Sequence, residues 1–131
     1  MTVAAPDYAD VILDGWLVDY GMDKWANGLT VNLTSTCGVL ALYADSSTYL
    51  GILASTSTGV VTDDSWKCSA VEHTDWDEPG FDNAAWSQAR VLGANDGSHD
   101  VTVAAISPQA KWIWTQDMNP IGEAYCRKTL C

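Results

Sequence analysis

The aromatic residues are the first candidates for chemistry, because seven Trp and five Tyr stand against one Phe. Trp and Tyr rings stack on flat apolar surfaces and also offer a polar edge, which suits carbohydrate binding. Trp16 follows the glycine of a predicted hairpin, whereas Trp25 and Trp76 lie in polar loops. The alternative is a structural role, but we expect these three to be exposed and to bind a ligand with polar neighbours from the same loops, Asp23, Asn27 and Asp75.

Calcium binding is the second possibility. Acidic and amide residues crowd at three places, 63–64, 75–78 and 95–96. Ca²⁺ takes about six to eight oxygen ligands from carboxylates, amides and carbonyls. None of the three places has the spacing of an EF-hand, and the alternative is a solvated acidic surface. The candidate ligands are Asp63, Asp64 and Asp77, and we expect at most a structural ion and no required cofactor.

Catalytic motifs are missing from the sequence. The two histidines, His73 and His99, do not belong to a metal motif such as HExxH, and there is no GxSxG or P-loop sequence. Paired carboxylates could serve a glycosidase, but such pairs arise easily among 17 acidic residues. We therefore expect a protein that binds its ligand without catalysing a reaction.

The charge balance limits the kinds of partner. The chain carries 17 acidic and 6 basic residues, a formal net charge of −11. Nucleic-acid binding is disfavoured because phosphate contacts need clustered Lys and Arg, and an anionic membrane surface is disfavoured by the same repulsion. No apolar stretch is long enough to cross a membrane. Neutral sugars, divalent cations, mineral surfaces and matrix proteins remain as partners.

The cysteines indicate an oxidising, extracellular compartment. Their number is even and their spacing is not that of a zinc site, in a chain poor in Lys and rich in Ser and Thr. Four cysteines allow three pairings. We favour Cys68 with Cys126, which leaves Cys37 and Cys131 for each other or for another chain. A glycosylation sequon that begins at Asn32 is consistent with secretion.

The composition predicts an all-β domain. Hydrophobic residues make up 47% of the 131 residues, enough for one core, and the abundance of Ser, Thr, Asn and Gly favours strands and turns over helices. Asp14-Gly15 is a hairpin-turn signal. Regularly spaced short strands are typical of a sandwich or barrel, and we expect them within 8–18, 29–33, 38–44, 49–54, 59–62, 101–106, 111–115 and 125–130.

Two segments share a local pattern in which an Asp precedes a Trp by a few small or polar residues, at 63–66 and 82–86. The Asp side chain can cap a single turn. The Trp is then expected to fold back onto the core.

Six motifs follow one another along the chain: DGWLV within 8–18, VLALYA at 39–44, LGILA at 50–54, TDDSWK at 62–67, WDEPGFDNAAW at 76–86 and AKWIW at 110–114. In this order they resemble the galactose-binding-like (discoidin-like) domains of glycosidases and of extracellular adhesive or matrix proteins. The resemblance implies a single antiparallel β-sandwich of jelly-roll type over residues 1–131. It also implies a structural calcium ion in a loop, and core positions for Trp66, Trp86, Trp112 and Trp114. It does not identify a ligand, because this fold carries many functions.

The C-terminal segment departs from the resemblance. Relatives are expected to begin with WIW and YCRK segments, whereas here these segments lie in the last part of the chain, at 112–114 and 125–128. Residues 110–131 are therefore a displaced strand segment. Either the segment folds back into its own sandwich as a permuted strand, or it is donated to the next subunit, which would build a head-to-tail filament.

The sequence thus supports two main functional interpretations. The first is a non-enzymatic extracellular binding or adhesion module for carbohydrate, with loops at one end of the sandwich as the site. The alternative is a structural subunit of an extracellular filament or matrix, assembled through the donated strand. A third, an accessory domain of a glycosidase, needs a catalytic neighbour.

Overall fold

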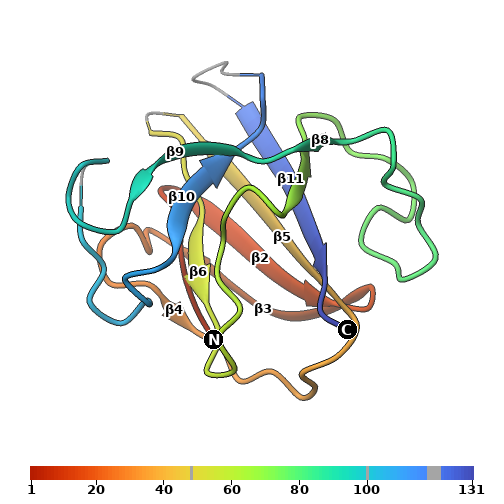
Figure 1. Ribbon diagram of the computed structural model, residues 1–131, viewed down its shortest axis with the longest axis horizontal. Coiled ribbons are helices and arrows are strands. Elements are labelled where there is room, and N and C mark those ends of the chain that lie inside the picture. Colours follow the sequence, from red (N-terminus) through yellow and green to blue (C-terminus); the bar gives the residue numbers. More distant parts are fainter. Residues whose placement is uncertain (48, 100, 118–121) are drawn as a thin grey trace.

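The computed structural model describes residues 1–47, 49–99, 101–117 and 122–131, and within them every pairing of named strands is antiparallel (Figure 1). This part of the chain holds no helix with the length and apolarity to cross a membrane. The strands are β1 (Thr2–Ala4), β2 (Tyr8–Leu13), β3 (Trp16–Met22), β4 (Leu29–Thr30), β5 (Val39–Ser46), β6 (Leu53–Ser55), β7 (Lys67–Ser69), β8 (Ser87–Gln88), β9 (Arg90–Ala94), β10 (Lys111–Trp114) and β11 (Gly122–Thr129). The all-β prediction is confirmed.

The larger sheet has six strands in the order β3-β2-β5-β11-β7-β8. Its first hairpin turns at Asp14 and Gly15, whose φ angles are 50° and 83°. Two successive positive φ angles are the requirement of the tight turn that suits twisted strands, so the predicted hairpin is confirmed. The Asp14 carboxylate accepts a hydrogen bond of 2.7 Å from the Val39 amide, which fixes the turn against β5.

The second layer consists of two smaller sheets, β4-β1-β6 and β9-β10. An isolated bridge between Ile52 and Ile113 connects them. In Figure 1, β6 and β10 lie across β2 and β5 of the larger sheet. The main hydrophobic core fills the space between the two layers, and both layers contribute side chains to it. Examples are Val3, Ala54 and Ile113 from the second layer and Val11, Leu42 and Ala124 from the larger sheet.

The outer face of the larger sheet is also partly buried, because the segment 70–86, which we call the covering loop, packs on it. Trp76 and Trp86 of the loop pack with Ile12, Ala41 and Tyr125 of the sheet in one buried cluster. The loop thereby explains why β5 is buried on both faces over its first four residues.

Two cations of the sheet hold the covering loop. Arg127 of β11 is only 2% exposed, and its Nη1 donates to the carbonyls of Trp76 and Phe81 at 3.0 and 3.3 Å. Its guanidinium also lies 5.3 Å from the centre of the Phe81 ring, a distance typical of cation–π contact. Lys67 of β7 donates to the carbonyl of Trp86 at 3.2 Å. The loop therefore packs on the sheet through apolar rings and is fixed through its own carbonyls.

The C-terminal segment lies in its own chain. β11 pairs with β5 over eight residues and with β7 over three. The favoured disulfide, Cys68–Cys126, is present and joins directly opposed residues of β7 and β11. Cys37 and Cys131, for which two alternatives were open, pair with each other and tie Cys131 to the loop before β5. In this structure β11 thus pairs within its own chain. The interpretation of residues 110–131 as a displaced segment, permuted or donated, stays a prediction.

Several predicted strands are wrong or too long. The segment 101–106 is not a strand, because the buried Asn95 side chain takes over its hydrogen bonds. Asn95 donates to the carbonyls of Val103 and Ile106, at 3.0 and 3.1 Å, and accepts from the Val103 amide at 2.8 Å. The strand expected at 29–33 is limited to Leu29–Thr30, and that expected at 59–62 is a single bridge at Val61.

Replacing Arg127 by Ala removes the donor to two loop carbonyls and leaves them buried without partners. Because each unsatisfied buried group costs about 1–3 kcal/mol, we expect the free energy of unfolding to fall by about 2–4 kcal/mol. Urea unfolding followed by tryptophan fluorescence measures the change. Arg90→Ala is the matched control, since Arg90 is exposed on β9. Equal effects of the two substitutions would show that the covering loop does not depend on Arg127.

Candidate functional site

The structure places the three tryptophans predicted to bind ligand in different environments. Trp16 is 79% exposed at the start of β3, as expected. Trp76 is 6% exposed, so its predicted exposure is wrong. It packs edge-on against Tyr125 with ring centres 5.1 Å apart, and Arg127 binds its carbonyl. Asp75 beside it is exposed and has a φ angle of 59°, so it forms the turn that directs Trp76 inward.

Trp25 is half-buried in a separate aromatic cluster on the outer side of the second layer. Its ring centre lies 4.3 Å from Trp112, 5.7 Å from Tyr49 and 6.1 Å from His99. Tyr49 is 54% exposed, and the predicted neighbours of Trp25, Asp23 and Asn27, are exposed. Because Trp25 packs against this second apolar cluster and Trp76 belongs to the one under the covering loop, the predicted residues do not form one site.

The three predicted calcium ligands have different structural environments. The Asp63 carboxylate accepts from the amide of Ser65 at 2.9 Å and from its hydroxyl, so it caps the turn that leads to Trp66. Asp64 is exposed, and Asp77 lies in the covering loop. Among the described residues, no group of three His, Cys, Asp or Glu side chains is arranged to hold a metal ion. Calcium binding stays a prediction.

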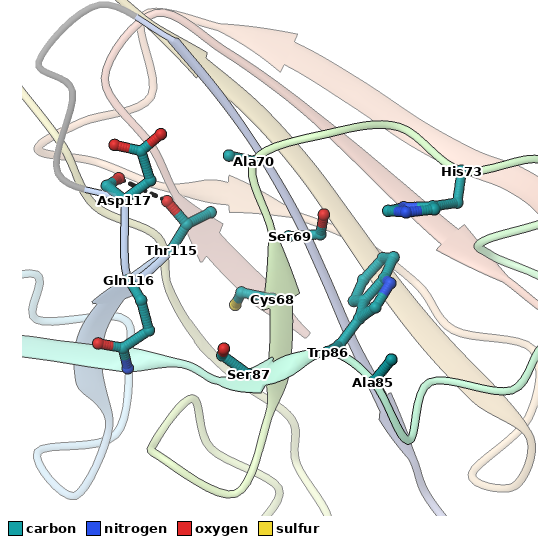
Figure 2. A pocket seen from close by; sticks show the side chains of 10 residues that line it. All are labelled: Cys68, Ser69, Ala70, His73, Ala85, Trp86, Ser87, Thr115, Gln116 and Asp117. Carbon is teal, nitrogen blue, oxygen red and sulfur yellow. Dashed lines mark hydrogen bonds between the residues drawn. The ribbon is translucent and has the colours of Figure 1, made fainter.

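A pocket of about 280 Å³ lies between the end of β10 and the covering loop (Figure 2). Figure 2 shows 115–117 on one side and His73 and Trp86 on the other, with β7 and Ser87 between them. Most of its residues are exposed, so it opens to solvent; they are Cys68, Ser69, Ala70, His73, Ala85, Trp86, Ser87, Thr115, Gln116 and Asp117.

Hydrogen bonds within the wall of this pocket fix its polar groups. Gln116 donates to the carbonyl of Gln88 at 2.9 Å, and the Thr115 hydroxyl donates to the carbonyl of Asp117 at 2.7 Å. His73 Nδ1 lies 3.0 Å from the carbonyl of Val71. Since a carbonyl can only accept, Nδ1 carries a proton in this contact. The pocket therefore offers both donors and acceptors beside the rings of His73 and Trp86, which lie 5.5 Å apart.

A second feature is the part of the larger sheet's outer face that the covering loop leaves open. Each of three neighbouring strands carries a tyrosine and a carboxylate two residues apart, and within each pair the tyrosine donates to the carboxylate. The pairs are Tyr8 with Asp10, Tyr43 with Asp45 and Tyr125 with Glu123. The rings form a continuous series from Tyr20 through Tyr8 and Tyr43 to Tyr125, with centres 5.1–6.2 Å apart. We call Tyr8, Asp10, Tyr20, Tyr43, Asp45 and Glu123 the tyrosine–carboxylate face.

These pairs shift the pKa values of the tyrosines upward. The hydrogen bond to Asp10 raises the pKa of Tyr8 to about 12, with burial as a further cause. Burial raises the pKa of Tyr43 and Tyr125, and the charge of Glu123 adds to both shifts. Burial also raises the pKa of Asp45, with repulsion from Asp7 and Glu123. Because the pKa values of the three tyrosines are raised, their hydroxyls keep their protons near neutral pH and donate to the paired carboxyl groups.

Sequence reasoning missed both features, although one had a readable signal. Tyr8-x-Asp10 lies within a predicted strand, whereas Tyr43-x-Asp45 and Glu123-x-Tyr125 extend just beyond the predicted bounds of two others. Residues two apart in a strand point to the same face. The pocket had no such signal, because its residues come from four separate segments of the chain.

Free energy of unfolding should decrease as the pH rises above about 10, the ordinary tyrosine pKa. The folded pKa values of Tyr8, Tyr43 and Tyr125 are raised, so the unfolded chain loses these protons first and becomes favoured. Urea unfolding at a series of alkaline pH values measures the slope. Tyr8→Phe with Tyr43→Phe should flatten it, and an unchanged slope in that variant would contradict the assignment.

Asn32 and Thr34 of the sequon are both exposed. When the chain is produced through a secretory pathway, we expect a glycan on Asn32, because the acceptor amide is accessible. Intact mass before and after treatment with peptide N-glycosidase measures it, with Asn32→Gln as the control. A mass equal to that of the bare polypeptide would show that the site is not used.

Comparison of this chain with family models, curated proteins and solved structures finds no match. The resemblance to galactose-binding-like domains therefore stays a prediction based on the six motifs.

Proposed function

We propose that this protein is a non-enzymatic extracellular binding module for carbohydrate, and that the pocket of Figure 2 is its site. We also propose that its two layers form a β-sandwich of the galactose-binding-like, jelly-roll type. The two disulfides are consistent with an extracellular location. The acidic net charge of −11 favours a neutral ligand over an anionic one.

The observation that carries the proposal is the mixture of groups around one small pocket. A sugar presents hydroxyl groups in its plane and apolar C–H groups on its faces, so it needs hydrogen-bonding groups beside an apolar surface. Here Gln116 and Thr115 line one side of the pocket, the rings of His73 and Trp86 line the other, and Ser87 lies between them. Trp86 is 7% exposed, so it contributes the edge of its ring, and His73 is the exposed ring.

The pocket is built on fixed elements. Its floor contains Cys68, which is bridged to Cys126 in the adjacent strand. Its rim contains Trp86, whose carbonyl accepts from Lys67. A site whose groups are already held in place loses less entropy on binding.

A glycan array, read with and without calcium, tests the proposal. We expect binding to a neutral glycan that falls about two- to tenfold for each of His73→Ala and Gln116→Ala, the range of one lost hydrogen bond. Both residues are exposed, so the fold should be kept. Gln109→Ala, also exposed but outside the pocket, is the control.

Two outcomes would contradict the proposal in different ways. Absence of binding to any glycan in either condition would reject the carbohydrate function. Binding that survives both pocket substitutions but is lost in Trp25→Ala would move the site to the aromatic cluster of Trp25, Tyr49 and His99.

A further inference from the structure

The outer face of the larger sheet divides into rows of different charge. Strand register places Leu17, Ile12, Ala41, Arg127 and Lys67 in one row. The next row contains Tyr20, Asp10, Tyr43 and Tyr125, and the one after it Met22, Tyr8, Asp45 and Glu123. The first row contains both cations of these three rows, and the other two carry carboxylates.

The covering loop lies over the row that contains the cations. Arg127 and Lys67 are satisfied there by loop carbonyls, and Arg127 lies against the Phe81 ring. The covering loop also reaches Tyr125, which is buried against Trp76. Away from Tyr125 the two acidic rows have no equivalent cover among the described residues: Tyr20 is 57% and Met22 64% exposed, and Glu123 is also exposed. In the described structure this part of the sheet face is thus an open surface of rings and carboxylates.

We propose that this uncovered surface, the tyrosine–carboxylate face, binds a lysine- and arginine-rich segment of another protein. This inference goes beyond the carbohydrate function and uses other residues. The carboxylates supply the complementary charge, and the tyrosine rings supply faces on which a cation can lie. Exposed Leu17 and Met22 on β3 can cover the aliphatic part of a Lys or Arg side chain.

Charge complementarity decides between this occupant and a second copy of the chain. Two copies would bring carboxylates against carboxylates in molecules with a net charge of −11 each, which disfavours association. Strand pairing along the edge of β3 is also disfavoured. The Tyr20 amide already donates to the Asp19 carboxylate at 2.8 Å, so it has a partner within its own strand. This favours a partner that lies across the face over one that extends the sheet.

Binding of a synthetic lysine–serine peptide to the intact protein tests the proposal, measured by calorimetry at low and physiological ionic strength. The comparison peptides carry arginine or glutamate in place of lysine. We expect both basic peptides to bind, and the glutamate peptide not to bind.

Two matched triple variants distinguish the effect of the charges on this face from the effect of the net charge of the protein. Asp10→Asn with Asp45→Asn and Glu123→Gln removes three charges from the face. Asp64→Asn with Asp75→Asn and Glu78→Gln removes three from exposed positions elsewhere. We expect the first variant to weaken binding about tenfold and the second to change it little. Tyr20→Ala, at unchanged charge, should weaken binding about two- to fivefold. Circular dichroism confirms that each variant is folded.

Several results would overturn the proposal. Equal weakening by the two triple variants would show that only net charge attracts the peptide. Unchanged binding in the Tyr20→Ala variant would show that the tyrosine rings do not contribute to peptide binding. No binding of either basic peptide, or self-association of the chain through this face in light scattering, would reject a cationic partner. Loss of glycan binding alone leaves this inference intact, because the glycan site is tested with His73 and Gln116.

Discussion

The contact between the buried Arg127 and the carbonyls of Trp76 and Phe81 is the constraint on which the rest of the outer face depends. A guanidinium can be buried only if its hydrogen-bonding groups find acceptors, and here the acceptors come from a loop about fifty residues away in sequence. The loop in turn needs the sheet, because Trp76 and Trp86 bury their rings on it. Each therefore fixes the other. Nε of Arg127 meets no acceptor among the described residues, so the burial is not fully compensated.

This constraint also separates the two surfaces that we assign to binding. Arg127 and Lys67 attach the covering loop to one part of the sheet. The edge of the loop then forms a wall of the pocket, with His73 and Trp86. The loop covers Ile12 of β2 and Ala41 of β5 but leaves Tyr20 and Met22 of β3 and Glu123 of β11 exposed. One loop attachment thus forms a wall of the pocket and leaves the tyrosine–carboxylate face open.

The sequence predicted the elements whose signals are local. The Asp14-Gly15 hairpin, the buried β5, the Asp-capped turns before Trp66 and Trp86 and the Cys68–Cys126 bridge all follow from adjacent residues or from few alternatives. It failed where distant groups decide the outcome. Val101–Ile106 reads as a strand by composition, but the Asn95 side chain satisfies its backbone and no strand forms. Trp76 lies in an acidic segment, and its burial depends on the distant residues Tyr125 and Arg127, which pack against its ring and bind its carbonyl.

The groups that hold the covering loop on the sheet are different from the side chains that the loop exposes to solvent. Its anchors are two rings and three carbonyl groups, and a carbonyl is present whatever the side chain at that position. The residues 70–75, which lie between β7 and the anchor Trp76, are all exposed. Apart from Asp75, which forms the turn before Trp76, substitutions there leave the groups that hold the loop in place. In an evolutionary sense, this segment is free to diversify, because the side chains at the rim of the pocket can change while the scaffold is kept.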